Sequence, residues 1–248
     1  MKKAPDHAFS LLELLVCIAI VSLLASLMFP ALSAARQRSY RVLCLSNQKQ
    51  LSLAAHHYWS DHQDRSFPYL LASGFQNTDY WFGRLEKGVE GERKLDRTQG
   101  ALWPYVDASG LALCPSFNYR SPDYKPKALG ASYGYGYNLH LAAMPGQTAS
   151  AYRMDALSQP ASTALFADAA QINDFQFPAT STRPLLEEFY YINDGPARYA
   201  NGHFRHQQKA VASFCDGHVA MASPRENTRD ERLPTVWVAR LESSMLRP

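Results

Sequence analysis

The sequence predicts an α+β protein in which a long N-terminal helix, half of it in a membrane, packs on an antiparallel β-sheet with long loops. Three observations favour this fold class. An apolar run occupies Phe9–Pro30, and the residues after it, up to about Asp61, repeat buried-type side chains at helical spacing. The rest of the chain is rich in strand and turn formers, with 14 Tyr, 15 Pro and 13 Gly in the whole sequence.

Composition restricts the function classes. The chain has 248 residues, so one domain of about 200 residues with its own core can follow the apolar run. Hydrophobic residues make up 46% and charged residues 19%, which excludes a disordered chain. The net charge is only +3 and no basic patch recurs, so we expect no nucleic-acid partner.

The run Phe9–Pro30 is long enough to span a bilayer, whose hydrocarbon core needs ~20 helical residues. Three interpretations compete: a plain signal anchor, a cleaved secretory signal with a weak site at Ser33-Ala34-Ala35, and a segment in which Glu13 is functional. A carboxylate at membrane depth costs roughly 2.5–3.5 kcal/mol on insertion scales. Because an anchor or a secretory signal has no need of it, Glu13 indicates a function.

The segment AFSLLELLVCIAIVSLLASLMFPAL resembles the class III signal of type IV pilins and type II secretion pseudopilins. That signal joins a short basic leader, a small residue, Phe, and a Glu near the start of an apolar run. The resemblance implies that prepilin peptidase cuts between Ala8 and Phe9 and that Phe9 is N-methylated. Glu13 is then the fifth mature residue and Pro30 the twenty-second. Ala8 departs from the family pattern, which usually has Gly before the cut.

Two residues of this segment have expected roles in assembly. When such helices bundle, the Glu13 carboxylate of one subunit pairs with the N-terminal amine of its neighbour, which offsets desolvation and sets the axial register. Pro30 lacks a backbone donor and clashes with the preceding turn, so a kink or local melting is expected there. The expected partners are prepilin peptidase, other pilin or pseudopilin subunits and the inner membrane, with the N-terminus cytoplasmic and the body periplasmic or at the cell surface.

Beyond Pro30 the helix is expected to continue to about Asp61. A stripe at three-to-four spacing predicts one buried face on it. The stripe consists of Tyr40, Cys44, Asn47, Gln48, Leu51, Ala54, Ala55 and Tyr58. The predicted organisation is a leader over 1–8, a transmembrane and assembly half of the helix over 9–30, its extramembrane half over 31–63, and a β-rich globular domain over 64–248.

The four cysteines allow few pairings. Cys17 lies in the apolar run, and the other three, Cys44, Cys114 and Cys215, allow at most one disulfide among themselves. Cys44 and Cys114 each lie beside aliphatic residues, and we expect a disulfide that pins the helix to the body in an oxidising compartment. Two buried free thiols are the alternative. The chain has no CxxC pair, and the spacing fits no zinc motif.

The body contains several strand and turn signals. Ser162–Ala170 is expected to be a buried strand ending at Asp168, and the alternating Tyr and Gly of Ala131–Leu141 suit a strand packed close to another backbone. Glu187–Tyr199 reads as a strand and an Asp-Gly turn. The C-terminal TVWVARL is either a short helix or an edge strand.

The clearest turn signal is Asp216-Gly217 between two apolar runs. It predicts a two-residue type I′ hairpin turn with strands near Lys209–Cys215 and His218–Ala222. His206 precedes Asp216 with nine residues between, which resembles the His–nine residues–Asp–Gly signature of a prepilin-associated C-terminal domain. Much of the chain resembles that group, and the resemblance implies an architecture rather than a chemistry.

Three possible metal sites stay open, although no cofactor is expected. His206, Asp216 and His218 are candidates for a divalent-ion site; the favoured alternative is a hydrogen-bonded corner in which His206 binds the hairpin backbone. Some pseudopilins hold calcium through oxygen ligands. The candidate calcium ligands here are Asp168, Asp174, Asp194 and Asp216. The end of the helix offers His56, His57, His62, Asp61 and Asp64, but its two adjacent histidines point about 100° apart and cannot easily share one ion.

We expect no enzymatic activity, because the chain contains no HExxH or Walker loop. The first hypothesis is a structural subunit of a type II secretion-like or type IV pilus-like filament. The alternative is a surface module that binds polysaccharide or peptide on a prepilin-type anchor, and a weaker third is a metal-dependent hydrolase using the His206 set. The aromatic candidates for binding are Tyr133, Tyr135, Tyr137 and Trp81.

Overall fold

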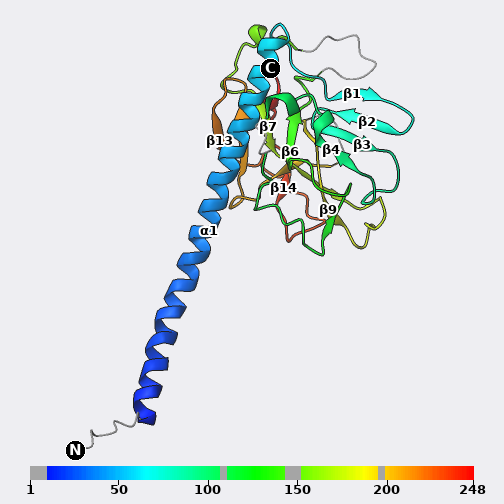
Figure 1. The fold of residues 1–248 in the computed structure, drawn as a ribbon. Coiled ribbons are helices and arrows are strands. Elements are labelled where there is room, and N and C mark those ends of the chain that lie inside the picture. Colours follow the sequence, from blue (N-terminus) through cyan, green and yellow to red (C-terminus); the bar gives the residue numbers. More distant parts are fainter. Residues whose placement is uncertain (1–9, 107–110, 143–151, 195–198) are drawn as a thin grey trace, which may run out of the picture. The chain divides into compact units, whose positions relative to one another are not determined.

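The computed structural model describes residues 10–106, 111–142, 152–194 and 199–248. The fold is α+β, with one long N-terminal helix and a β body that contains antiparallel sheet (Figure 1). The chain divides into two units, residues 1–39 and 40–248. The predicted cleavage residues Ala8 and Phe9 lie outside the described residues.

Helix α1 spans Leu11–Asp61 and ends where the sequence predicts. Its first turn is closed by a reciprocal cap. The backbone N–H and the hydroxyl of Ser10 both donate to Oε2 of Glu13 at 2.8 Å, and the Glu13 N–H donates to the Ser10 hydroxyl at 3.2 Å. This pattern is a capping box, which satisfies N–H groups that have no partner inside the helix.

Of the kink or local melting expected at Pro30, local melting does not occur, because α1 is helical on both sides of the proline. Proline removes the hydrogen bond that its own N–H would give to the carbonyl of Ser26, and its ring crowds that carbonyl. The neighbouring residues keep theirs, and in an apolar environment a helix has no better way to satisfy its backbone.

The C-terminal part of α1 buries the predicted stripe. Its buried residues are Cys44, Asn47, Gln48, Leu51, Ser52, Ala54, Ala55 and Trp59. The Asn47 side-chain amide donates to the carbonyl oxygen of Ala112 at 2.9 Å, and that of Gln48 donates to the carbonyl oxygen of Val211 at 3.2 Å. These polar contacts join the helix to the body, and Trp59 rather than the half-buried Tyr58 closes the stripe.

The central sheet has five strands in the order β10-β6-β7-β12-β13. The strands are β10 (Tyr191–Ile192), β6 (Tyr135–Asn138), β7 (Ala164–Asp168), β12 (Ala210–Phe214) and β13 (Val219–Ala222). All neighbours pair antiparallel except β10 and β6, which are parallel. In Figure 1, β6, β7 and β13 lie beside the C-terminal part of α1. The predicted strand ending at Asp168 is β7.

Three smaller sheets complete the body. One is an antiparallel meander of β1 (Leu70–Ser73), β2 (Asn77–Tyr80), β3 (Gly83–Glu86) and β4 (Leu95–Asp96). A second joins β5 (Tyr124–Lys125), β9 (Leu185–Glu188) and β8 (Ala170–Asn173), with β5 parallel to β9. The third pairs β11 (Gly202–His203) with β14 (Val238–Ala239). Helix α2 (Ser243–Leu246) follows, so the C-terminal segment forms both a strand and a short helix.

The hairpin predicted around Asp216-Gly217 is present as β12 and β13, but its turn type differs. Among the three loop residues Cys215, Asp216 and Gly217, only Gly217 has a positive φ, at 88°. A type I′ turn requires positive φ at both central residues, so the loop is a three-residue connection with glycine in the left-handed position. The N–H group of Cys215 donates to the carbonyl oxygen of Thr163 at 2.9 Å, and that of Asp216 donates to the carbonyl oxygen of Pro160 at 3.2 Å. These hydrogen bonds hold both residues in backbone conformations with negative φ.

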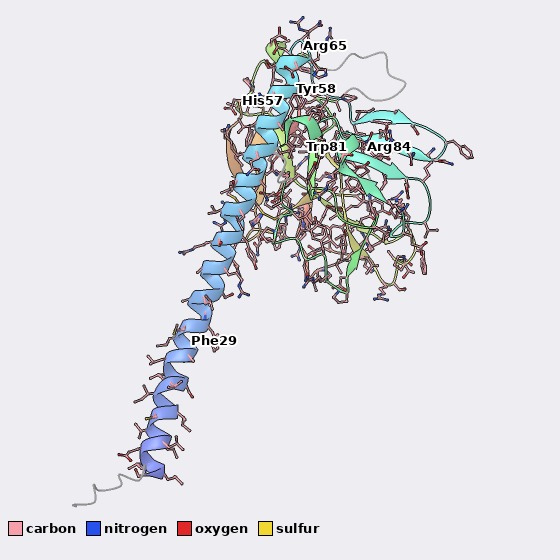
Figure 2. The ribbon with its side chains drawn as sticks, viewed as in Figure 1. Phe29, His57, Tyr58, Arg65, Trp81 and Arg84 are labelled. Atoms are coloured by element: carbon pink, nitrogen blue, oxygen red, sulfur yellow. A yellow bond between two sulfur atoms is a disulfide. The ribbon has the colours of Figure 1, made fainter. Side chains whose placement is uncertain are left out.

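The aromatic row of β6 is core. The side chains of Tyr133, Tyr135 and Tyr137 are at most 1% exposed, and Trp81 lies among them inside the body (Figure 2). A Cβ added at Gly136 would lie 2.7 Å from the carbonyl carbon of Tyr191. The alternation of Tyr and Gly therefore packs β6 closely against β10, as predicted.

Candidate functional site

The N-terminal half of α1 exposes its apolar side chains. Helix α1 is long and apolar enough to cross a membrane, and none of its most apolar window is buried in the chain. Phe29 is 70% exposed and projects outward from the helix (Figure 2). Apolar surface of this extent is stable in lipid or against other apolar helices, because exposing it to water costs about 25 cal/mol per Å².

Glu13 lies at the start of this surface. Its oxygen Oε2 accepts both hydrogen bonds of Ser10, and among the described residues Oε1 accepts none. The carboxylate therefore caps its own helix through one oxygen and keeps the other for a donor from elsewhere. The sequence identified Glu13 as functional but did not predict the cap.

The predicted disulfide between Cys44 and Cys114 is present, with the two Cα atoms 5.5 Å apart. It joins α1 to the segment before β5, and both residues are buried. The imidazole Nε2 of His206 lies 3.6 Å from Sγ of Cys114 and 3.4 Å from Oδ2 of Asp168. The histidine of the nine-residue signature therefore packs against the disulfide.

A buried ionic network surrounds this histidine. The guanidinium of Arg205 lies 2.5 Å from Oδ1 of Asp168 and donates to the carbonyl oxygen of Gly134 at 2.7 Å. The Val211 N–H donates to Oδ2 of Asp168 at 2.8 Å. Because Asp168 is fully buried and both of its oxygens are engaged, it stabilises the junction of β6, β7 and β12 and offers no oxygen to calcium.

Glu188 is a second buried carboxylate that the sequence did not single out. Burial raises the pKa of Glu188, and hydrogen bonds from Ser132 and from the Tyr119 hydroxyl at 2.9 Å oppose that rise. The Ser132 N–H donates at 2.9 Å. These contacts connect β9 to the loop before β6. No sequence motif marks Glu188, because its partners come from distant segments.

The structure does not gather His206, Asp216 and His218, which corrects the metal-site hypothesis. His206 lies before the start of β12 and Asp216 follows its end. Asp216 instead accepts from its neighbour, with His218 Nδ1 2.6 Å from Oδ1. In place of the predicted corner, the His206 imidazole contacts Cys114 and Asp168 and not the hairpin turn. Only the backbone of His206 reaches the predicted hairpin, through hydrogen bonds with the backbone of Lys209.

The histidine that does bind the hairpin turn comes from α1. Nε2 of His56 lies 3.1 Å from the carbonyl oxygen of Cys215, and Lys49 Nζ donates to the carbonyl oxygen of Gly217 at 2.7 Å. Nδ1 of His56 lies 2.7 Å from the carbonyl oxygen of Ser52. Burial and the charge of Asp216 raise the pKa of the Cys215 thiol to about 12, so it is a poor nucleophile at neutral pH.

The other candidate metal ligands are engaged separately. His62 stacks on Tyr58 at 3.7 Å between ring centroids, whereas His57 is exposed. Asp194 lies 2.6 Å from His140 Nε2 and 2.8 Å from Arg247 Nε. Each of the four carboxylates predicted to bind calcium contacts an arginine or histidine side chain. The partner is a different residue for each carboxylate.

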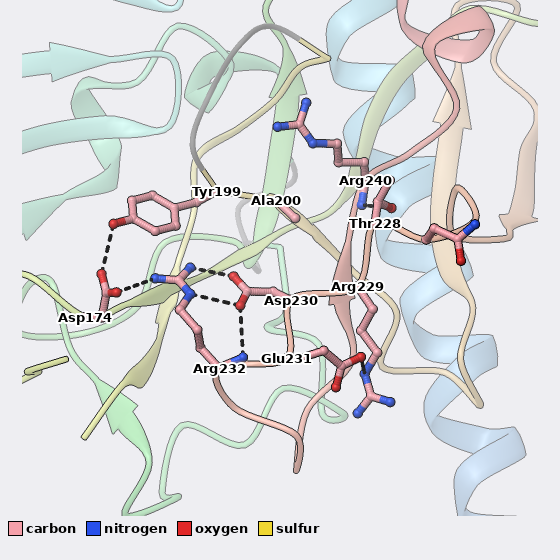
Figure 3. Close-up of a pocket in the computed structure, with 10 residues that line it drawn as sticks. Asp174, Tyr199, Ala200, Thr228, Arg229, Asp230, Glu231, Arg232 and Arg240 are labelled. Carbon is pink, nitrogen blue, oxygen red and sulfur yellow. Dashed lines mark hydrogen bonds and ion pairs between the residues drawn. The ribbon is translucent and has the colours of Figure 1, made fainter. Parts of the chain in front are cut away.

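A cavity of about 450 Å³ lies beside Asp174 and the segment before β14 (Figure 3). Its charged groups pair with one another: Arg232 contacts Asp174 at 3.0 Å and Asp230 at 2.5 Å. The Arg232 guanidinium also lies 4.0 Å from the ring centroid of Tyr199. No sequence motif predicts this cavity, whose lining residues come from four separate stretches of the chain: Asp174, 199–200, 227–232 and Arg240.

The four aromatic candidates for ligand binding are not available, because Tyr133, Tyr135, Tyr137 and Trp81 are all buried. The Trp81 indole N–H donates to the carbonyl oxygen of Tyr190 at 3.0 Å, and the Tyr137 hydroxyl donates to that of Phe67 at 3.1 Å. The polar atoms of Trp81 and Tyr137 are therefore satisfied inside the core. Because all four side chains are buried, a binding surface must use other residues.

The prokaryotic N-terminal methylation motif matches residues 3–29 of the chain. The chain therefore carries a prepilin-like N-terminal signal on an α+β fold, and among the described residues one helix is suited to a membrane. A search of curated proteins and a search of solved structures each found no match to the chain.

Proposed function

We propose that the chain is a structural subunit of a type II secretion-like or type IV pilus-like filament. On this proposal, prepilin peptidase removes residues 1–8 and Phe9 is N-methylated. The protein then resides in the inner membrane with the body on the periplasmic side, and its partners are other pilin or pseudopilin subunits.

The observation that carries the proposal is Glu13 inside the matched methylation motif, at the start of an apolar helix surface that the chain itself leaves exposed. A membrane anchor has no use for the carboxylate. In a bundle of such helices, the amine at Phe9 of a neighbouring subunit supplies the donor for Oε1. The same bundle covers the apolar side chains.

The test is incorporation of a Glu13→Gln variant into filaments. Glutamine at this position preserves the capping box, so the variant removes the charge and not the helix start. We expect the variant to insert and to be cleaved, but to be incorporated at a small fraction of the wild-type level.

Ser10→Ala is the matched control, because it removes the capping hydroxyl and keeps the carboxylate. It should be incorporated. Normal incorporation of Glu13→Gln would refute the assembly role, and a loss confined to Ser10→Ala would show that the glutamate serves only as a cap.

A further inference from the structure

A second cavity, of about 340 Å³, lies between β8, β9, β10 and the loop after β8. Four aromatic side chains line it: Phe175, Phe189, Tyr191 and Tyr199. The rings of Phe175 and Tyr199 stack at 5.5 Å with an angle of 16°, and those of Phe189 and Tyr191 lie 4.5 Å apart. Unlike the tyrosines of β6, these rings are partly exposed, and Phe175 is 56% exposed.

One amide side chain that lines the cavity is that of Gln171. Gln171, in β8, is only 6% exposed and lines the cavity. Within the described residues its side-chain amide makes no hydrogen bond. The amide is not sealed from solvent, so water or a bound molecule that enters the cavity can supply its hydrogen-bond partner. An amide both donates and accepts, which suits a hydroxyl group.

The charged side chains at the cavity form ion pairs with one another. Lys125 is fully buried and bridges Glu90 and Glu187, 2.9 Å from Oε2 of Glu187. Nζ of Lys127 lies 3.3 Å from Oε1 of Glu187 and 4.7 Å from the ring centroid of Phe189. Glu90 also pairs with Arg93, whose Nη2 lies 2.8 Å from its Oε1. Each charged side chain that lines the cavity is therefore already in an ion pair, which leaves none of them unpaired to attract a charged ligand.

We propose that this cavity binds a pyranose unit of an uncharged polysaccharide. The C–H faces of a sugar ring are apolar and weakly positive, and they pack on the negative faces of aromatic rings. The sugar's hydroxyls meet the Gln171 amide and the edge of the ionic network. The volume falls within the range of about 300–1,000 Å³ typical of small-molecule sites.

The position of the cavity also suits a ligand that is longer than one sugar unit. Tyr199 lines both this cavity and the one in Figure 3, so a chain that extends past Tyr199 enters the second hollow. This inference does not depend on filament assembly, because the cavity forms within one body.

The test is calorimetric titration of the full chain in a zwitterionic detergent without a sugar head group. The probes are hexasaccharides of glucose, mannose and xylose. An oligogalacturonate and an uncharged hexapeptide are the comparison ligands. We expect at least one uncharged hexasaccharide to bind and both comparison ligands to fail.

Two variants locate the site, and one is a control. Phe175→Ala removes one aromatic ring from the lining of the cavity, and Gln171→Met removes the amide while keeping a similar side-chain volume. Each variant should weaken binding about tenfold, as expected for the loss of a stacking face or of a hydrogen bond. Phe177→Ala changes a ring of the same loop that is 87% exposed and does not line the cavity, so it should bind as wild type. A melting curve for each variant checks its fold.

The proposal is overturned if no uncharged hexasaccharide binds or if a comparison ligand binds more tightly. It is also overturned if Phe175→Ala, which alters only an exposed ring, binds as well as Phe177→Ala.

Discussion

The imidazole of His56, in α1, lies 3.1 Å from the carbonyl oxygen of Cys215, in the turn between β12 and β13. Helix α1 therefore contacts the backbone of the Asp216-Gly217 turn directly. The same ring contacts the Ser52 carbonyl oxygen at 2.7 Å, which fixes its orientation on the helix.

Replacing His56 by alanine should lower the free energy of unfolding of the body by about 1–2 kcal/mol, because it leaves the buried Cys215 carbonyl without this partner. Denaturant unfolding followed by tryptophan fluorescence measures the change. His57→Ala is the control; that side chain is exposed, and its effect should stay within about 0.5 kcal/mol. Equal effects at the two positions would contradict the contact.

The disulfide between Cys44 and Cys114 closes a sequence separation of 70 residues. Removing it with the double Ser variant should destabilise the body by about 4 kcal/mol in the loop-entropy account. Thermal unfolding of the full chain in detergent measures the loss. Cys17→Ser should leave the melting temperature of the body unchanged, and an equally stable double variant would show that the bridge does not hold helix and body together.

Gly136→Ala should destabilise the body by about 1–3 kcal/mol through overpacking, because its Cβ would lie 2.7 Å from backbone of Tyr191 in β10. Gly74→Ala is the matched control, since the nearest atom to its Cβ would be 3.7 Å away. The measurement is the denaturation midpoint of each variant. A Gly136→Ala protein as stable as Gly74→Ala would mean that β6 and β10 are not this close.

Asp194 should make stability depend on acid pH. Burial alone would raise its pKa, but hydrogen bonds from Arg247, His140 and Ser243 outweigh burial and lower the pKa to about 2 from an ordinary 3.8. A lowered pKa in the folded state adds stability that is complete above the unfolded-state pKa and is lost as the pH falls through the folded-state pKa. Asp194→Asn should therefore be less stable than wild type at neutral pH, and the difference should shrink as the pH falls from about 4 to about 2.

Melting temperatures of both proteins across that pH range test this prediction. Asp155→Asn is the control, because Asp155 and Arg153 form an exposed pair, and such pairs contribute about 0–1 kcal/mol. A constant difference between Asp194→Asn and wild type down to pH 2 would contradict the lowered pKa.

The sequence predicted those parts of the fold that depend on residues close together in the chain. The stripe from Cys44 to Ala55 repeats at helical spacing, and it is the buried face of α1. The hairpin of β12 and β13 follows from Asp216-Gly217 because a turn is encoded by a few adjacent residues. Its turn type was wrong because Thr163 and Pro160, some fifty residues earlier, bind the loop backbone.

The chemistry of single residues was harder to predict. His206 and Asp216 share a signature in sequence, yet β12 separates them, and the partners of His206 are Cys114 and Asp168. Gln171 and Glu187 carry no motif, and only strand pairing between β8 and β9 brings them together. Such long-range contacts leave no periodic signal. By contrast, Glu13 could be identified from the sequence, because the free-energy cost of a carboxylate in a membrane is evident from the apolar residues next to it in the chain.

The central claim is that the N-terminal segment is a prepilin signal, and mass spectrometry of the mature protein's N-terminal peptide tests it most directly. We predict a chain that begins with N-methylated Phe9, residues 1–8 having been removed. An intact Met1 would mean an uncleaved anchor and a start near Arg36 would mean a secretory signal; either result would contradict the account.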